Sequence, residues 1–236
     1  HGAAGASHHV FYSLVEPGDR VVSIMPTYQQ LYSIPESYGA DLHLLHLKQE
    51  NDYLPDLDEL RALVKPGTKL ICINNPNNPS GVVYSAETIA DLAAVLKKKE
   101  AEFGHPIYVI SDEPYRELVY GDVQVPYLTK YYNNTIVCYS FSKSLSLPGD
   151  RIGYILVPNE VENFELIYKA VCGAGRSLGY VCAPSMMQFV IRECVGMTGD
   201  ISAYKMNRDI LLEAFDECGF KTAKPDGAFY LFMKSP

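Results

Sequence analysis

Positive charge is scarce in this sequence. Its 20 lysines and arginines are outnumbered by 28 aspartates and glutamates, so the formal net charge is −8 at neutral pH. A chain with this balance is repelled by the phosphates of nucleic acids and by anionic lipid surfaces. Bulk electrostatics therefore argue against a nucleic-acid or membrane partner and favour a small-molecule function.

Paired cysteines and long apolar runs are also lacking. The six cysteines are scattered without C-x-x-C spacing, and several lie in apolar segments, which argues against a zinc site or a disulfide framework. No apolar run approaches the length of a membrane span. We therefore expect no metal, no membrane segment and a location in the reducing cytoplasm. Because the chain starts at His1 without a methionine and ends directly after an apolar segment, we also expect a fragment of a longer protein.

Hydrophobic residues are abundant, and their pattern indicates an α/β fold. They make up 47% of the 236 residues, which is enough for a sizeable core. Up to about residue 158, short apolar segments alternate with helical ones, which is typical of a mostly parallel sheet with helices on both faces. The expected strands, of which the last two are predicted to be buried and parallel, are residues 19–25, 42–47, 69–73, 106–110, 135–139 and 152–157.

The chain beyond residue 158 predicts a different organisation. The expected elements there are an amphipathic segment, a glycine-rich loop, two helices and a strand, at residues 164–171, 173–179, 185–195, 201–218 and 228–233. The glycines near residues 196–199 mark a candidate domain boundary. We therefore assign residues 1–198 to a large domain and residues 199–236 to the start of a smaller α+β domain.

Four chemically versatile side chains stand just after predicted strands: Tyr28, Asn78, Asp112 and Lys143. Open α/β sheets bind ligands beyond the carboxyl ends of their strands. The shared placement predicts that these four side chains line one site.

Lys143 lies among hydroxyl groups in a loop between two predicted strands, and Arg151 follows eight residues later. A lysine amine can attack a carbonyl when burial or a neighbouring positive charge lowers its pKa, and it can then form a Schiff base with pyridoxal phosphate. The guanidinium of Arg151, together with the hydroxyls of Ser140 and Ser142, suits a phosphate group. An ordinary surface loop carries the same residue types, so this string alone leaves both readings open.

Three further strings are compatible with the same ligand. Asp112 in an apolar setting needs a cation, which a protonated pyridine nitrogen would supply, unless the residue caps a helix. Two prolines hold Asn78 in a rigid turn, and Tyr28 either stacks on a flat ring or packs as an ordinary aromatic. Ala3 and Ala4 at a helix start expose amides that favour an anion, or they serve close packing.

In this order and spacing, these strings resemble the class I/II aminotransferase family, which consists of fold type I pyridoxal-phosphate enzymes. The resemblance covers nearly the whole chain. Its motifs are Gly2-Ala3-Ala4, Asn75-Pro76-Asn77-Asn78-Pro79-Ser80-Gly81, Ser111-Asp112-Glu113-Pro114-Tyr115, Ser140-Phe141-Ser142-Lys143, Arg151-Ile152-Gly153 and Gly227-Ala228-Phe229-Tyr230. It implies a three-layer α/β/α large domain that binds the cofactor and lacks its N-terminal part here, followed by an interdomain helix and the beginning of the small C-terminal domain.

The resemblance also implies roles for the site residues. Lys143 would carry the Schiff base and shuttle a proton, and Asp112 would keep the ring nitrogen protonated. Asn78 and Tyr115 would hydrogen-bond the phenolic oxygen of the ring, and Tyr28 would stack on its face. The predicted phosphate contacts are Ala3, Ala4, Ser140, Ser142 and Arg151. A cis peptide bond is implied between Asn78 and Pro79.

The implied activity is transfer of an amino group between an L-amino acid and a 2-oxo acid, in amino-acid metabolism, by a homodimer. Arg176 either contacts a substrate carboxylate, which would suit a dicarboxylic substrate, or is a solvated loop residue. The family's main carboxylate-binding arginine and its partner-subunit residues fall outside the printed sequence. Alternatives are a carbon–sulfur lyase, an aminocyclopropane-carboxylate-synthase-like enzyme of the same fold, and a non-catalytic regulatory module that binds pyridoxal phosphate.

Overall fold

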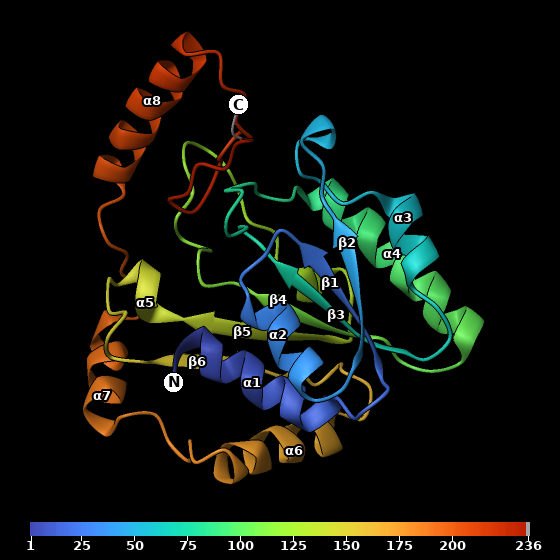
Figure 1. Ribbon diagram of the computed structural model, residues 1–236. Coiled ribbons are helices and arrows are strands. Elements are labelled where there is room, and N and C mark those ends of the chain that lie inside the picture. Colours follow the sequence, from blue (N-terminus) through green and yellow to red (C-terminus); the bar gives the residue numbers. More distant parts are fainter. Residues whose placement is uncertain (235–236) are drawn as a thin grey trace.

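One sheet of six strands forms the centre of the computed structural model, which describes residues 1–234 (Figure 1). Its strands are β1 (Arg20–Met25), β2 (Asp41–His46), β3 (Thr68–Asn74), β4 (Tyr108–Asp112), β5 (Thr135–Ser140) and β6 (Gly153–Leu156). They lie in the order β2-β1-β3-β4-β5-β6, and the first five are parallel to their neighbours. The α/β class with a mostly parallel sheet is therefore confirmed.

The last strand departs from the prediction. Residues 152–157 were expected to form a buried parallel strand, whereas β6 pairs antiparallel with β5 and its side chains alternate between half-buried and exposed. The prediction was wrong because a parallel neighbour needs a connection that returns along the whole strand. The only helix between β5 and β6 in the described chain is α5 (Phe141–Ser144), a single turn that is too short to do so. Lys143 lies in this turn.

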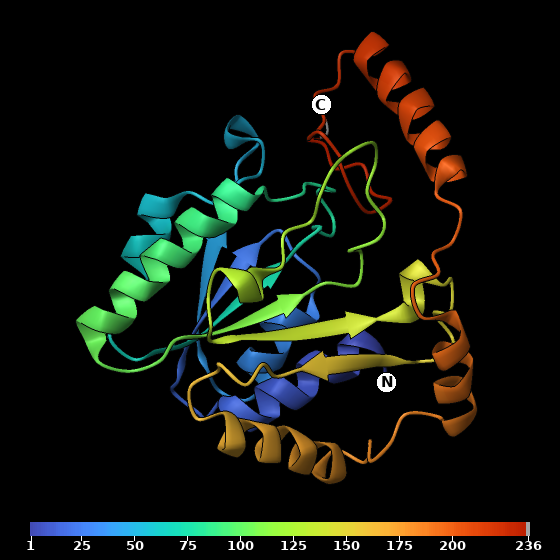
Figure 2. The same ribbon diagram turned by 180° about the vertical axis from the view of Figure 1, so that it is seen from behind.

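Helices cover both faces of the sheet. Their bounds are α1 (Gly2–Leu14), α2 (Gln30–Ser37), α3 (Leu57–Leu63), α4 (Ala86–Phe103), α6 (Phe164–Ser177), α7 (Ser185–Cys194) and α8 (Ser202–Glu217), with 3-10 turns η1 (Gln49–Asn51) and η2 (Leu128–Lys130). The helices α1, α2 and α6 lie on one face, and α3 and α4 lie on the other (Figures 1 and 2). The predicted three-layer arrangement follows from these two coverings.

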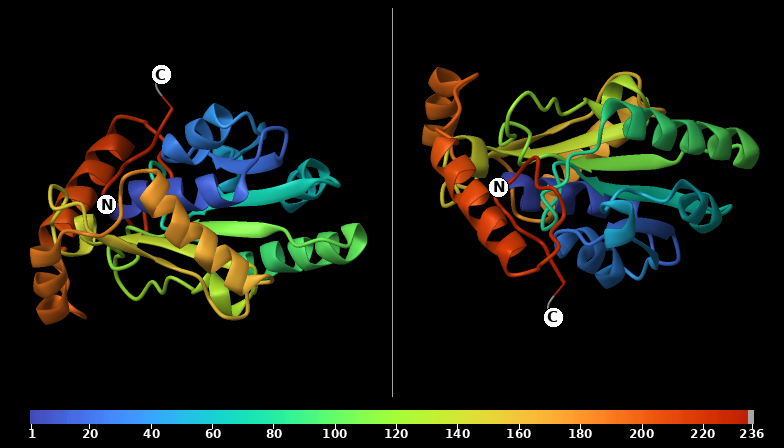
Figure 3. Two further views of the ribbon diagram at one scale, coloured as in Figure 1. Left: turned by 90° about the horizontal axis from the view of Figure 1, so that it is seen from below. Right: turned by 90° about the horizontal axis from the view of Figure 1, so that it is seen from above.

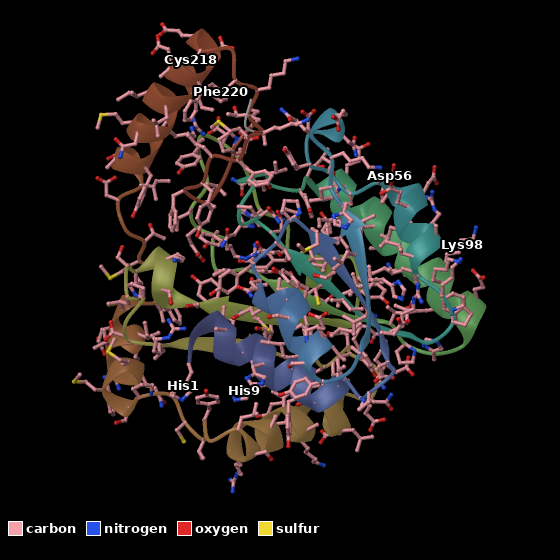
Figure 4. All side chains as sticks on the ribbon, viewed as in Figure 1. His1, His9, Asp56, Lys98, Cys218 and Phe220 are labelled. Atoms are coloured by element: carbon pink, nitrogen blue, oxygen red, sulfur yellow. The ribbon has the colours of Figure 1, made fainter. Side chains whose placement is uncertain are left out.

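Apolar residues from successive strand positions fill the two interfaces. Val21 belongs to the same buried apolar cluster as Val10 and Phe11 of α1, whereas Val22 belongs to the cluster that contains Leu92 and Leu96 of α4. This alternation is the expected one for strands buried on both faces. Figure 4 shows the two layers through their labels: His1 and His9 mark α1, and Asp56 and Lys98 mark α3 and α4.

Two predictions in the C-terminal third were wrong. The glycine-rich stretch at 173–179 is not a loop up to residue 177, because α6 continues and buries Ala174 and Gly175, small residues that permit close packing near His9 of α1. Residues 228–233 do not form a strand. Within the described chain only single bridges occur here, Thr222 to Met233 at the end of the segment and Val119 to Gly227 just before it, so no ladder forms.

The domain assignment stays a prediction. The helix α8 begins at Ser202, three residues beyond the expected boundary, and α7 and α8 lie on the side of the molecule away from α4 (Figure 3). The last two residues of the expected second domain, 235–236, lie outside the described residues. Across residues 1–234, none of the helices combines the length and the apolar character that crossing a membrane requires.

Candidate active site

The carboxyl ends of the central strands open onto one cavity. Its wall takes side chains from the start of α1, from the segments after β1, β3, β4 and β5, and from the C-terminal segment. The lining residues are Ala3, Ala4, Tyr28, Gln30, Asn78, Asp112, Pro114, Tyr115, Ser140, Ser142, Lys143, Pro148, Arg151 and Tyr230. All the predicted cofactor contacts are among them, so the structure brings together residues that are up to 148 positions apart in the sequence.

Lys143 is placed by a capped helical turn. The hydroxyl of Ser140, the last residue of β5, accepts a hydrogen bond from the backbone N–H of Ser142 at 3.0 Å and so starts α5 at the strand end. Burial lowers the pKa of the Lys143 ammonium below its ordinary 10.5, and the positive charge of Arg151 lowers this pKa further. Both effects increase the fraction of neutral amine that can act as a nucleophile.

The second part of the site is a pocket suited to an anion. The guanidinium of Arg151 donates to the Ser142 hydroxyl at 3.4 Å and to the backbone carbonyl of His1 at 3.2 Å, so it joins α5 to the start of α1. Gly2 is required there, because a Cβ at this position would lie 2.5 Å from Arg151 Nη2 and the residue has a φ of +71°. A guanidinium, two hydroxyls and a helix N-terminus together form a strong phosphate-binding arrangement.

Asp112 ends β4 and is 2% exposed. Its Oδ2 accepts a hydrogen bond from Asn74 at 3.0 Å, whereas its Oδ1 is buried without a partner. Burial raises the pKa of Asp112 from its ordinary 3.8 to about 7, and the negative charge of Glu113 raises this pKa as well. An unpartnered carboxylate oxygen in the wall of a cavity is an incomplete arrangement that a cationic ligand atom would complete.

A row of hydrogen-bonding groups stands beside Asp112. The side-chain amide of Asn78 donates to the Tyr115 hydroxyl at 3.4 Å, and this hydroxyl lies 2.6 Å from that of Tyr230. Burial raises the pKa of Tyr115 above its ordinary 10, so its hydroxyl keeps its proton and can donate. The peptide bond between Asn78 and Pro79 is cis, as the resemblance implies.

Four lining residues were not recognised from the sequence as part of the site: Gln30, Pro114, Pro148 and Tyr230. Tyr230 lies in the segment that was expected to be a strand. Gln30 lies at the start of α2, and its side-chain amide donates to the Ser7 hydroxyl at 3.0 Å. Pro148 bounds the same wall and its carbonyl accepts from Arg151 at 2.6 Å. Tyr230 belongs to a quoted motif, which could have indicated it, whereas Gln30 carried no signal beyond its closeness to Tyr28.

Tyr28 and Arg176 differ from the other predicted residues. Tyr28 lines the cavity but is 47% exposed, so its ring has a free face for stacking. Arg176 lies near the C-terminal end of α6, is exposed and does not line the cavity. Its contact with a substrate carboxylate stays a prediction, for which the described residues offer no geometry.

Comparison with known families gives the same classification over the whole chain. The family description "Aminotransferase class I and II" matches residues 1–236. An aspartate aminotransferase of Thermotoga maritima is 29% identical over 237 residues, and an aspartate aminotransferase of Pyrococcus horikoshii is 30% identical over 238 residues. The alignments cover 99% and 98% of this chain but only 59% and 58% of these two relatives.

Solved structures share the fold. An amino transferase from Eubacterium rectale is 50% identical with a TM-score of 0.95, and the match covers 99% of this chain and 59% of that one. A PLP-dependent aminotransferase from Streptococcus suis is 37% identical with a TM-score of 0.70, covering 92% of this chain and 54% of the other. The chain therefore belongs to the class I and II aminotransferase family, and it spans somewhat less than 60% of the length of the curated relatives cited above.

Pyridoxal phosphate is the cofactor of this family. The residues of the cavity fit it at three separate points. The Arg151 pocket suits its phosphate, the unpartnered Oδ1 of Asp112 suits its protonated ring nitrogen, and the Asn78 and Tyr115 donors suit its phenolic oxygen. Lys143 lines the same cavity as these three groups.

Proposed function

We propose that the protein is a pyridoxal-phosphate-dependent aminotransferase that moves an amino group between an L-amino acid and a 2-oxo acid. The observation that carries the proposal is the convergence of Lys143, Asp112 and Arg151 on one cavity at the carboxyl end of the sheet. A nucleophilic amine, a partner for a cationic ring and a phosphate pocket are the three requirements of this cofactor.

Binding and orientation come from the edge of the cavity. Arg151, Ser140 and Ser142 hold the phosphate, with the amides of Ala3 and Ala4 beside them. Tyr28 covers the ring face, and the donors on Asn78 and Tyr115 fix the ring's phenolic oxygen. Ser140 ends a buried strand and caps the turn that carries Ser142, and Ala3 and Ala4 lie in the first turn of α1, so these groups are held in place by the fold.

The chemistry centres on Lys143 and Asp112. Pyridoxal phosphate, when bound, supplies an aldehyde that condenses with amino groups and a ring that accepts the electron pair released at the substrate's α-carbon. Asp112 Oδ1 would accept a hydrogen bond from the protonated ring nitrogen and so favour its charged form. Lys143 Nζ would hold the cofactor covalently in the resting protein and, once a substrate amine has displaced it, would serve as the base that takes up and returns a proton. The lowered pKa of Lys143 favours this exchange.

Amino-group transfer can be tested directly with the full-length protein. Nitrogen-15-labelled aspartate and glutamate would be incubated with 2-oxo acids, because the two relatives described above are named as aspartate aminotransferases. We expect label in the new amino acid. Pyruvate with free ammonia and a thiol from a sulfur amino acid would show a lyase, and a cyclic amino acid would show a synthase. A protein that binds the cofactor and yields none of these products would be a regulatory module.

We also propose that the protein acts as a homodimer and that residues 199–236 begin a second domain. Exposed apolar side chains on the outer faces of α6 and α7 support an interface: Leu166, Tyr168, Met186 and Phe189. A monomer by analytical ultracentrifugation of the full-length protein would contradict the dimer. The cytoplasmic location stays a prediction.

A further inference from the structure

Asn74, the last residue of β3, uses both ends of its side chain inside the fold. It is 3% exposed and does not line the cavity. Its Nδ2 donates to Asp112 Oδ2 at 3.0 Å and to the Asp112 backbone carbonyl at 3.1 Å. Its Oδ1 accepts a hydrogen bond from the backbone N–H of Asn78 at 2.6 Å. One buried amide therefore contacts two residues that line the cavity.

The sheet register produces this arrangement. Asn74 and Asp112 are paired positions at the carboxyl ends of the neighbouring strands β3 and β4. Paired residues on adjacent strands place their side chains on the same face, within reach of one another. The chain then turns back over Asn74, so the backbone N–H of Asn78 reaches the side-chain Oδ1 of Asn74.

The two hydrogen bonds have separate consequences for the cavity. The bond to Oδ2 occupies one carboxylate oxygen of Asp112 and leaves Oδ1 as the buried oxygen without a partner. The bond from the backbone N–H of Asn78 holds that residue in place, and the side-chain amide of Asn78 reaches the Tyr115 hydroxyl. Asn74 thereby sets the placement of Asp112 relative to Asn78.

We propose that Asn74 is a positioning residue that aligns Asp112 with the ring nitrogen of pyridoxal phosphate and Asn78 with the ring's phenolic oxygen. It contacts neither ring atom itself. The inference rests on the proposed function, because it concerns how the same cavity holds its cofactor. The side-chain amide of Asn74 thereby couples two contacts to the ring, that of Asp112 with the ring nitrogen and that of Asn78 with the phenolic oxygen.

The neighbouring asparagines provide a matched control. Asn75 is 4% exposed, and its Oδ1 accepts from the backbone N–H of Tyr84 at 2.9 Å. Asn77 is 1% exposed and bonds to Ser80 and to the Pro26 carbonyl. Both support the turn without a side-chain bond to Asp112. Asn75→Ala therefore removes a comparably buried amide that has no direct bond to the residues facing the ring.

The test compares ligands within each variant of the full-length, cofactor-free protein. Dissociation constants would be measured for pyridoxal phosphate, for its analogue with carbon in place of the ring nitrogen, and for its 3-deoxy analogue. We expect Asn74→Ala to weaken pyridoxal phosphate about 10- to 100-fold, as loss of a charge-assisted contact does. The loss of affinity caused by Asn74→Ala should be severalfold smaller for either analogue than for pyridoxal phosphate, because each analogue lacks one of the two aligned contacts. Asn75→Ala should affect all three ligands equally.

Equal losses for the three ligands in Asn74→Ala would overturn the inference, because a merely structural role does not distinguish ring atoms. Asn74→Ser, which keeps a small polar group, supplies the same comparison if the alanine variant folds poorly. Failure of the proposed function gives a different result, because the wild-type protein itself would then not bind pyridoxal phosphate at Lys143. If the wild-type protein binds pyridoxal phosphate but the Asn74 variants lose the same affinity for all three ligands, only the positioning role is refuted.

Discussion

The strand ends around the cavity and the helices α7 and α8 differ sharply in burial. Every residue of β4 and β5 is buried, and these strands carry Asp112 and Ser140 at their ends. In contrast, α8 contains no buried residue and α7 contains one, Met187. The difference shows where the described chain can hold a side chain accurately. The candidate functional groups stand on elements packed from both faces, whereas the apolar residues of α8 are uncovered within residues 1–234.

The apolar residues of α8 show that its exposure does not reflect a polar helix. Met206 and Ile210 are each 59% exposed, and Tyr204 and Leu211 are 44% exposed. Apolar surface of this extent marks an interaction site in most proteins. The helix α8 therefore presents an apolar surface that the rest of residues 1–234 does not cover.

The largest expected effect comes from the strand-end region. Lys143→Ala in the full-length protein should reduce amino-group transfer by about 10²- to 10⁴-fold or more, because both the nucleophile and the proton carrier are lost. Steady-state assays with an amino donor and a 2-oxo acid measure the change. Lys98→Ala on α4, where the side chain is exposed, is the matched control and should leave the rate unchanged. A fully active Lys143→Ala variant would show that amino-group transfer does not depend on Lys143 and would contradict a reaction site at the strand ends.

Asp112→Asn should separate stability from activity. The folded-state pKa of Asp112, about 7, lies above its ordinary 3.8, so its contribution to stability is present below about pH 3.8 and is lost as the pH rises to about 7. This difference corresponds to about 4 kcal/mol. Asparagine does not titrate, so the cofactor-free variant should gain up to about 4 kcal/mol over the wild type between pH 3.5 and pH 8, while catalysis falls.

Denaturant unfolding of the cofactor-free proteins across this pH range measures the gain. The exposed residue Asp122 supplies the control, because Asp122→Asn should leave the pH profile of stability nearly unchanged. An Asp112→Asn variant that is less stable than the wild type at pH 8 would contradict the account of the buried, unpartnered carboxylate.

A pair of isoleucine substitutions tests the contrast in burial itself. Ile110 of β4 is fully buried and Ile210 of α8 is 59% exposed. Ile110→Ala should lower the free energy of unfolding by about 2–5 kcal/mol through lost burial and a residual cavity, whereas Ile210→Ala should change it by less than about 0.5 kcal/mol. Denaturant unfolding compares the two. A cost at Ile210 equal to that at Ile110 would mean that α8 is covered in the full-length protein.

The smallest expected effect concerns the phosphate pocket. Arg151→Ala should weaken pyridoxal phosphate about 10- to 100-fold, because a charge-assisted contact is lost, and should leave the affinity for pyridoxal nearly unchanged. Titration of the cofactor-free protein with both compounds gives the ratio. Arg61→Ala, at an exposed arginine of α3, is the control. Equal losses for both compounds would show that Arg151 supports the fold rather than the phosphate.

The sequence predicts the strand-end region well because two signals coincide there. Continuous apolar runs identify β3, β4 and β5, and a polar residue directly after each run must lie at the ligand-binding edge of a parallel sheet. Asp112 and Lys143 could therefore be placed beside one another without coordinates, and the cavity contains both.

The remaining features depend on tertiary contacts that local patterns do not contain. Nothing in the run of asparagines distinguishes Asn74 from Asn75, because only the register of β3 against β4 brings Asn74 to Asp112. The apolar segment at 228–233 has strand composition but no neighbouring strand in the described chain, and Tyr230 turns instead to Tyr115. In α6, Gly175 is buried beside His9 of α1, a contact between two helices that the local glycine pattern does not contain.

Borohydride reduction of the cofactor-loaded, full-length protein, followed by peptide mass spectrometry, tests the central claim most directly. We expect one pyridoxyl-phosphate adduct, on the peptide that contains Lys143. An adduct on a different lysine, or none in protein saturated with the cofactor, would contradict the assignment of Lys143 and with it the proposed aminotransferase.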